Sequence, residues 1–218
     1  MDLFTQSWTA LRAAVAGLAE EDFGKPSGCA GWLVRDLVCH LVIDAQDVLI
    51  TLATPESGEP TRDAVTYWEV SSTAPTGEDP LDALTVRLAA AYQDPALLAF
   101  HLDDVGSAAG RAAQLADPTA RVGTRGQILT ARDYLGAYVL EWTLHHLDLT
   151  AHLPAVPGPP PESLARARAL LEQLAAAPFP AAWPDAEALL VGTGRRAPTA
   201  ARRAELGALA SRLPLVVG

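Results

Sequence analysis

The segment EWTLHHLDL, residues 141–149, places side chains that could bind a metal ion within an apolar stretch. If this segment is helical, Glu141 and His145 lie one turn apart and only about 40° apart around the helix axis. Asp148 then lies on the same side as His145, whereas His146 is turned about 100° away from it. The spacing therefore predicts one imidazole and one carboxylate on a common inward-facing surface, without His146.

A third candidate ligand, His40, ends the run GWLVRDLVCHL at the edge of an apolar helical stripe, with Asp44 one turn further on. Two His and one carboxylate from two helices are the donor set of an open catalytic divalent-metal site, which has three protein ligands and one free position. The spacing alone leaves a plainer interpretation open. A Glu-x-x-x-His pair arises often by chance, and a single His near a core is usually only hydrogen-bonded.

Several other residues invite a functional interpretation but are explained more simply by packing. Cys39 should point about 100° away from His40, so we expect a small buried residue there. The segment VGTGRR at 191–196 lacks the Gly-Lys-Ser/Thr ending of a phosphate loop, and we interpret it as a helix C-terminus with a glycine cap. Arg35, Asp44 and Tyr138 could face a cavity, but the sequence assigns them no role. Core positions are expected for the remaining aromatic residues of note: Trp8, Trp32, Trp142, Tyr134 and Tyr138.

Composition limits the classes of protein to consider. The chain has 218 residues, of which 50% are hydrophobic, so it can bury a sizeable core. No apolar run reaches the roughly 18–20 residues of a membrane span, and acidic Asp2 without a basic segment argues against a signal peptide. Two Cys without a CxxC motif suit a reducing, cytoplasmic environment. The net charge of −10, without a basic stripe, argues against nucleic-acid binding.

The pattern of apolar residues predicts an all-α protein. Thr130 is a suitable N-cap for the helix that carries Glu141, with Asp133 at the N3 position. The long connections leave room for only one short extended piece, in ARVGTRGQIL at 120–129. The four helices predicted for the main body cover 2–19, 32–52, 80–100 and 130–152, joined by long crossovers at 54–80 and 102–129.

The proline-rich segment PAVPGPPPES, from residue 154, predicts a linker. We therefore predict a four-helix bundle over residues 1–153. Residues 154–218 would form the linker and a small helical extension, with helices near 161–177 and 199–212. A four-helix bundle of this kind builds metal sites from facing side chains in its core.

Two longer segments resemble a known family. PSGCAGWLVRDLVCHL resembles the P-[ST]-x-x-x-G-W-[ST]-V-R-D-L-x-x-H-L signature of the DinB-like superfamily. More narrowly, it resembles the branch that contains the N-terminal domain of mycothiol-dependent maleylpyruvate isomerase and the mycothiol S-transferases. TARDYLGAYVLEWTLHHLDLTAHL is similar to the fourth helix of that branch, in which E-x-x-x-H-x-x-D-L recurs. The tail is similar as well, with its T-G-R and its closing R-L-P-L.

The resemblance implies that His40, Glu141 and His145 are the metal ligands and the catalytic centre, with zinc or another divalent ion bound. It also implies mycothiol as a thiol cosubstrate. Two departures from the family pattern stand out. Leu33 occupies the usual Ser/Thr position, which should cost about 1 kcal/mol of helix capping. The tail is shorter than the isomerase's own C-terminal domain, which leaves the substrate open.

Such a site would act on a small-molecule thiol. A free thiol with a pKa of about 8.5 is only about 3% ionised at pH 7, and coordination to a metal ion favours the thiolate. The implied reactions are S-transfer to an electrophile and thiol-assisted cis–trans isomerisation of an unsaturated acid. Two alternatives remain open: a hydrolase that uses metal-bound hydroxide, and a non-catalytic metal-binding, stress-associated protein. The sequence leaves the electrophile unidentified and allows either a monomer or a homodimer.

Overall fold

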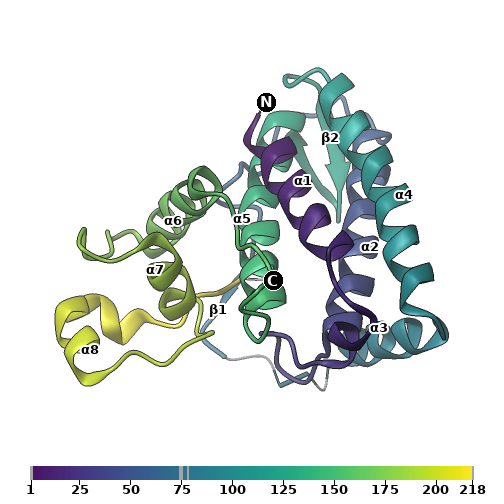
Figure 1. The fold of residues 1–218 in the computed structure, drawn as a ribbon. Helices are drawn as coiled ribbons and strands as arrows, with labels where there is room; N and C mark the ends of the chain where they lie inside the picture. The colour runs from purple at the N-terminus through teal and green to yellow at the C-terminus, as the bar shows by residue number, and fades with distance from the viewer. Residues whose placement is uncertain (1, 74–75, 78, 218) are drawn as a thin grey trace.

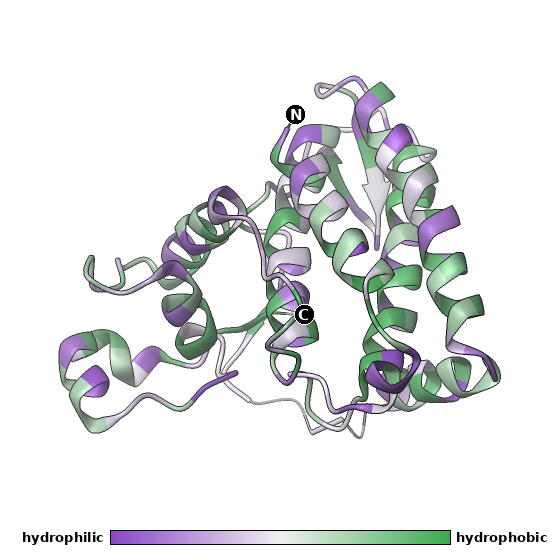
Figure 2. Ribbon diagram, viewed as in Figure 1, coloured by the Kyte–Doolittle hydropathy of each residue, from purple (hydrophilic) through white to green (hydrophobic). Residues whose placement is uncertain are grey.

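Four long helices form the body of the protein, with further helices packed along one side (Figure 1). The computed structural model describes residues 2–73, 76–77 and 79–217. Apolar residues of the long helices face one another across the bundle interior (Figure 2). The expected all-α class with a four-helix bundle is confirmed. The bundle helices are α1 (Leu3–Ala16), α2 (Val34–Leu52), α4 (Pro95–Leu115) and α5 (Ala131–Thr150).

The starts of the two helices that carry the candidate ligands differ in their capping. Thr130 begins α5 as predicted, because its side chain accepts a hydrogen bond from the Asp133 backbone N–H at 3.1 Å. Leu33 begins α2 without a side-chain cap. As expected there, the Asp36 carboxylate accepts a hydrogen bond from the Leu33 N–H at 2.8 Å and so takes over part of the capping.

The third predicted helix, 80–100, is wrong. The chain forms α3 (Pro80–Ala91), breaks, and begins the bundle helix α4 at Pro95. Asp94 caps α4 by accepting the Ala96 N–H at 2.8 Å, and proline suits the first helical position because its missing N–H has no partner there. Helix α4 then continues to Leu115, through a stretch that the sequence pattern predicts as a connection.

Close packing between α1 and α4 explains why α4 tolerates a glycine in its interior. Trp8 of α1 donates its indole N–H to the Gly106 carbonyl at 2.8 Å. A Cβ atom at Gly106 would lie only 2.7 Å from the Trp8 ring. Glycine weakens the helical pattern in the sequence, but here it allows the tryptophan to lie against the α4 backbone.

The predicted extended piece is a β-hairpin that leads into α5. Strand β2 (Arg121–Thr124) pairs antiparallel with β3 (Gln127–Thr130). The two residues of the turn, Arg125 and Gly126, have φ angles of 50° and 73°. Such angles match the right-handed twist of a two-residue hairpin.

The tail packs against the bundle through α6. Helix α6 lies beside α5, and Ser163 Oγ lies 2.8 Å from Ser7 Oγ of α1. The helix C-terminus predicted at 191–196 is confirmed, with Thr193 as cap and Gly194 at a φ of 80°. The helix that ends there, α7, was not predicted. The tail helices are α6 (Pro161–Ala175), α7 (Asp185–Gly192) and α8 (Ala200–Leu206), and 3-10 turns lie at Glu20–Gly24 and Gly207–Arg212.

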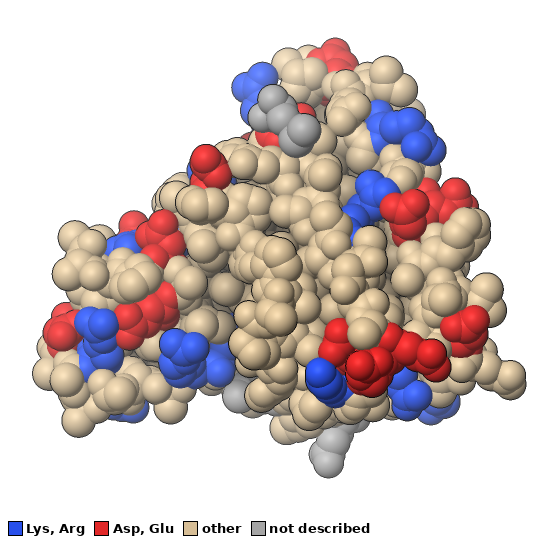
Figure 3. Space-filling view, viewed as in Figure 1, with Lys and Arg blue, Asp and Glu red and all other residues tan. Residues whose placement is uncertain are grey.

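The end of the tail returns to the bundle. Strand β4 (Val216–Val217) pairs antiparallel with β1 (Val70–Ser71), which lies in the connection after α2. On the face shown in Figure 3, charged side chains gather toward the edges of the molecule, with uncharged surface between them. Within the part of the chain that the structure describes, no helix combines the length and the apolar character needed to cross a membrane.

Candidate metal centre

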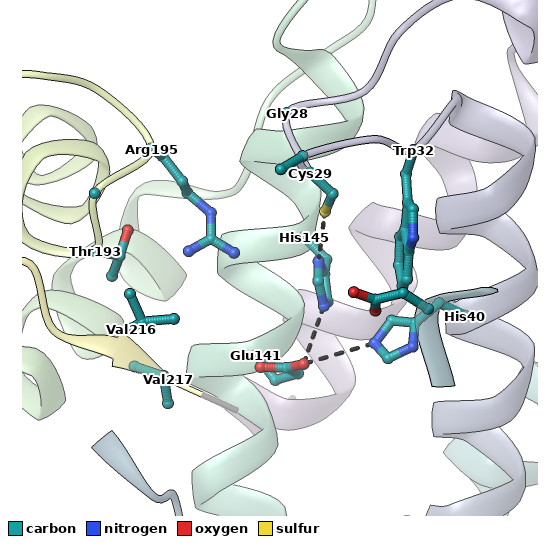
Figure 4. A pocket seen from close by; sticks show the side chains of 13 residues that line it. Gly28, Cys29, Trp32, His40, Glu141, His145, Thr193, Arg195, Val216 and Val217 are labelled. Carbon is teal, nitrogen blue, oxygen red and sulfur yellow. Dashed lines mark hydrogen bonds and ion pairs between the residues drawn. The ribbon is translucent and has the colours of Figure 1, made fainter. Parts of the chain in front are cut away.

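The three residues proposed from the sequence as ligands lie together. His40 projects from α2, and Glu141 and His145 project from α5 (Figure 4). Glu141 Oε1 lies 3.0 Å from His145 Nε2 and 3.7 Å from His40 Nε2. The two imidazole rings meet edge to face, with their centroids 4.8 Å apart. Both Nε2 atoms therefore approach the same carboxylate oxygen.

These separations suit a single divalent ion. Zinc lies about 2.0–2.2 Å from nitrogen and oxygen ligands, so two ligand atoms 90–120° apart around one ion are about 3.0–3.7 Å from each other. The observed distances of 3.0 and 3.7 Å fall in that interval. Asp44 joins the three residues in a group whose ligand atoms all lie within 4.8 Å of one another. Its buried Oδ2 has no hydrogen-bond partner among the described residues, which a cation would supply. The residues present therefore fit a bound metal ion.

The electrostatics of the cluster favour an ionised carboxylate next to the imidazoles. Burial alone would raise the pKa of Glu141, but the adjacent His145 and His40 rings hold that pKa well below its usual value. Burial would lower the pKa of His145, but the Glu141 charge and the hydrogen bond with Asp148 raise it well above its usual value. Because a His ligand must be neutral, binding of an ion at this place would release a proton from His145.

Asp148 contacts the nitrogen of the His145 ring that points away from Glu141. Its Oδ2 lies 3.1 Å from His145 Nδ1, which leaves Nε2 directed at Glu141. A carboxylate on the second ring nitrogen of a ligand His fixes the ring's orientation and tautomer. Asp148 is only 1% exposed, and Arg195 compensates its charge with two hydrogen bonds, from Nε at 2.8 Å and from Nη2 at 2.9 Å.

The loop before α2 also contacts this side of α5. Cys29 Sγ lies 3.3 Å from Asp148 Oδ2 and 3.7 Å from His145 Nδ1. The Gly28 N–H donates to the Asp148 carbonyl at 2.8 Å, and a Cβ at Gly28 would lie 2.6 Å from Asp148 Oδ1. Burial raises the pKa of the Cys29 thiol, so it stays protonated and can donate to Asp148.

Sequence reasoning missed Cys29 and Arg195 as members of the site. Arg195 belongs to the T-G-R motif of the tail, and Cys29 lies in the PSGCAGW segment, so both were inside stretches that carried the family resemblance. Nothing in their spacing indicated a contact with α5, because the bond from Arg195 to Asp148 spans 47 positions and that from Cys29 spans 119.

Neighbouring residues largely follow their expected roles. His146 points away from the site and lies 2.9 Å from the Pro157 carbonyl oxygen. Trp32 is only 8% exposed, but it also lines the pocket beside His40, at a ring separation of 5.2 Å, so its role exceeds core packing. The other expected core residues are buried: Trp8, Trp142, Tyr134, Tyr138 and Cys39.

A pocket of about 350 Å³ opens beside the three candidate ligands. The bundle supplies one side of it through His40, Glu141 and His145. The tail supplies the opposite side, through Thr193–Arg195 and the Val216–Val217 strand (Figure 4). Pockets that bind small molecules have about 300–1,000 Å³ and apolar walls with a few directed polar groups. This pocket has the size and the lining of a small-molecule site.

The family described as mycothiol maleylpyruvate isomerase N-terminal domain matches residues 4–150. The chain belongs to this family. The match confirms the resemblance, and it includes the bundle with all three candidate ligands. Comparisons with curated proteins and with solved structures give no match.

Membership of the mycothiol maleylpyruvate isomerase N-terminal domain family relates the chain to enzymes that depend on mycothiol. The matched region ends at residue 150, so the tail side of the pocket, with Arg195 and the Val216–Val217 strand, lies outside it. The family thus includes the side of the pocket that carries the three candidate ligands but not the tail side.

Proposed function

We propose that this protein is a divalent-metal-dependent enzyme that uses a low-molecular-weight thiol, mycothiol first, as its cosubstrate. His40, Glu141 and His145 would bind the ion, with zinc the first choice for two imidazoles and a carboxylate. The reaction would be S-transfer to an electrophile or thiol-assisted isomerisation of an unsaturated acid. The observation that carries this proposal is the convergence of the three donors beside a pocket, in a member of a mycothiol family.

A divalent ion in this position supplies Lewis acidity, which lowers the pKa of a coordinated thiol below its free value of about 8.5. The chain's own residues supply the geometry. Asp148 fixes the His145 ring through Nδ1, and Arg195 fixes Asp148 with two hydrogen bonds. Trp32 packs against the His40 ring. The ligand side chains are thereby held in position before the ion or the thiol binds.

The tail side of the pocket suits an acidic substrate. Arg195 lines the pocket with a guanidinium group that keeps its charge, since the Asp148 carboxylate raises its pKa despite burial. Val216 and Val217 add apolar surface on the same side. An unsaturated or electrophilic acid would therefore meet the Arg195 guanidinium, whose charge Asp148 partly balances, and apolar side chains on the side of the pocket opposite the candidate ligands.

The first prediction is a joint dependence on metal and thiol. The purified protein should hold close to one divalent ion per chain by elemental analysis. Calorimetry should show mycothiol binding to the metal-loaded form, and turnover of a generic electrophile should require both thiol and ion. A chelator should abolish turnover and added zinc should restore it. His40→Ala and Glu141→Ala should remove activity while circular dichroism still shows a helical protein.

His152→Ala provides the matched control, because His152 is an exposed His just beyond the end of α5. This variant should keep its metal content and its activity. Absence of any first-row metal, even after reconstitution, would contradict the proposed site. If no thiol binds the zinc form and ester or amide hydrolysis proceeds without thiol, the mechanism with metal-bound hydroxide replaces this one.

A further inference from the structure

Asp44 is a buried carboxylate beside the candidate metal centre to which the sequence assigned no role. It follows His40 by one turn of α2 and is only 5% exposed. Its Oδ2 is buried and accepts no hydrogen bond from the described residues. A buried polar atom without a partner typically costs about 1–3 kcal/mol, and more if it is charged. Asp44 Oδ2 therefore needs a partner other than the polar side chains around it.

The direction of the Asp44 carboxylate indicates what that partner is. Oδ2 lies 3.6 Å from His40 Nε2, and Glu141 Oε1 lies 3.7 Å from the same nitrogen. A carboxylate that only orients a ligand His contacts the other ring nitrogen, as Asp148 does at His145 Nδ1. Asp44 is instead on the side of the His40 ring that faces the candidate ion. We infer that Asp44 is a fourth protein donor to this ion, an inference that rests on the proposed metal-dependent function.

The position of Asp44 also keeps the pocket accessible. His40, Glu141 and His145 all line the pocket, whereas Asp44 does not. Asp44 therefore approaches the centre from the interior of the bundle, behind the three pocket-lining ligands. A thiol that enters from the pocket does not meet the Asp44 side chain, so a fourth protein donor is compatible with an open coordination position.

A second carboxylate changes the chemistry expected of the centre. Two neutral His and one carboxylate leave a divalent ion with a net charge of about +1, and Asp44 brings that charge to about zero. A bound thiolate in a neutral centre keeps more of its nucleophilicity than in a cationic one. With four protein donors, a bound thiol would be the fifth ligand, a number to which catalytic zinc sites sometimes expand.

The test compares Asp44→Asn with Asp47→Asn, which makes the same change in charge on the same helix. Asp47 lies 3.6 Å from Arg125 and is not part of the metal-ligand group. Zinc affinity is measured by competition with a chromophoric chelator. Since loss of outer-shell partners already weakens metal binding by about 10–100-fold, Asp44→Asn should weaken it at least about tenfold. Asp47→Asn should keep the wild-type affinity.

Two further measurements separate a donor from a structural residue. Without metal, Asp44→Asn should melt at the wild-type Tm or above it, because the variant replaces a buried carboxylate that lacks a full set of partners. The rise in Tm on addition of zinc should then be smaller than in the wild type. The visible spectrum of the Co²⁺-loaded protein should change in Asp44→Asn and stay constant in Asp47→Asn.

Each outcome decides a different point. If the wild type binds zinc and Asp44→Asn binds it equally well, Asp44 is not a donor and the proposed function stands. If affinity falls but the Co²⁺ spectrum is unchanged, Asp44 acts through His40 and the donor assignment is wrong. A lower Tm of the metal-free Asn variant with unchanged affinity identifies a structural role. If neither the wild type nor Asp47→Asn binds zinc, the proposed function fails, and the Asp44 assignment fails with it.

Discussion

His145 and His146 are consecutive residues in opposite environments. The His145 ring contacts Glu141 and Asp148 and faces the pocket. The His146 ring is 1% exposed and lies 2.9 Å from the Pro157 carbonyl oxygen, in the segment that connects α5 to the tail. Burial lowers the pKa of His146, so its ring is neutral and can donate to that carbonyl. One residue thus belongs to the candidate metal centre and the other fastens the chain after α5.

The contrast predicts opposite results for two alanine variants. His145→Ala should abolish metal binding, because it removes a candidate ligand. His146→Ala should keep the metal and lose about 1 kcal/mol of unfolding free energy, since it removes the hydrogen bond between the buried His146 ring and the Pro157 carbonyl. Elemental analysis and urea denaturation measure the two effects. If His146→Ala lost the metal and His145→Ala kept it, the assignment of the helix face would be one residue out of register.

The sequence predicted the directions of individual side chains correctly where these depend only on the geometry of one helix. The directions of Glu141, His145 and His146 follow from positions on one helix, and the structure places them as expected. His40 was a third candidate from its position on an apolar helical stripe, but only the family resemblance linked it to Glu141 and His145, because no local pattern links residues on α2 and α5. The contacts of Arg195 and Cys29 with Asp148 could not be predicted, since they depend on how distant segments pack.

At the scale of the element, α5 differs from the other bundle helices because it is buried on almost every side. It contacts α1 and α2 in the bundle and α6 in the tail. On a helix without a solvent face, charged groups need partners, because a buried charge without one is costly. Glu141, His145 and Asp148 meet this condition through one another and through Arg195. Helix α5 is therefore the element on which the candidate centre depends.

Capping of α5 should affect stability without affecting the metal centre. Thr130→Ala removes the hydroxyl that accepts the Asp133 N–H and should cost about 1 kcal/mol of unfolding free energy. Metal affinity should stay unchanged, because Glu141 lies three turns away from the cap. Thr150→Ala is the control, since its hydroxyl only donates to the His146 and Leu147 carbonyls at the other end of α5. Urea denaturation showing equal stability of Thr130→Ala and the wild type would refute the capping role.

The wrong prediction for 80–100 has a physical origin at this scale. The apolar pattern of α3 runs on into α4, while Asp94 and Pro95 mark a new helix start between them. Gly106 and Gly110 are weak helix formers in the rest of α4. Their place in a helix follows from the contacts of Trp8 with this face of α4, which no local pattern contains. By contrast, the N-cap at Thr130 and the extended piece before it are local signals, and both are found, although the pairing of that piece into a hairpin was not predicted.

At the scale of the whole molecule, the tail completes a pocket that begins in the bundle. Arg195 reaches Asp148, α6 packs on α5, and β4 pairs with β1 in the connection after α2. The division at residues 153–154 was predicted from the proline-rich composition that follows, and it stays a prediction. The prolines indicate that the chain leaves the helix after α5, but they do not report whether the chain beyond them packs back onto the preceding helices.

These contacts predict that the bundle and the tail unfold together. Detaching the tail would leave the Asp148 charge buried without Arg195, and breaking a buried ion pair costs about 3–5 kcal/mol. Hydrogen exchange at increasing urea should therefore give peptides from 131–150 and from 161–175 the same free energy of opening. Arg195→Gln should let the tail peptides exchange at lower urea than the α5 peptides. Arg196→Gln, a change at the exposed neighbouring position, should leave the free energies of opening of the two sets of peptides equal. Independent exchange of 161–175 in the wild type would instead establish the tail as a separately folding unit, and the pocket would then form only when that unit is docked on α5.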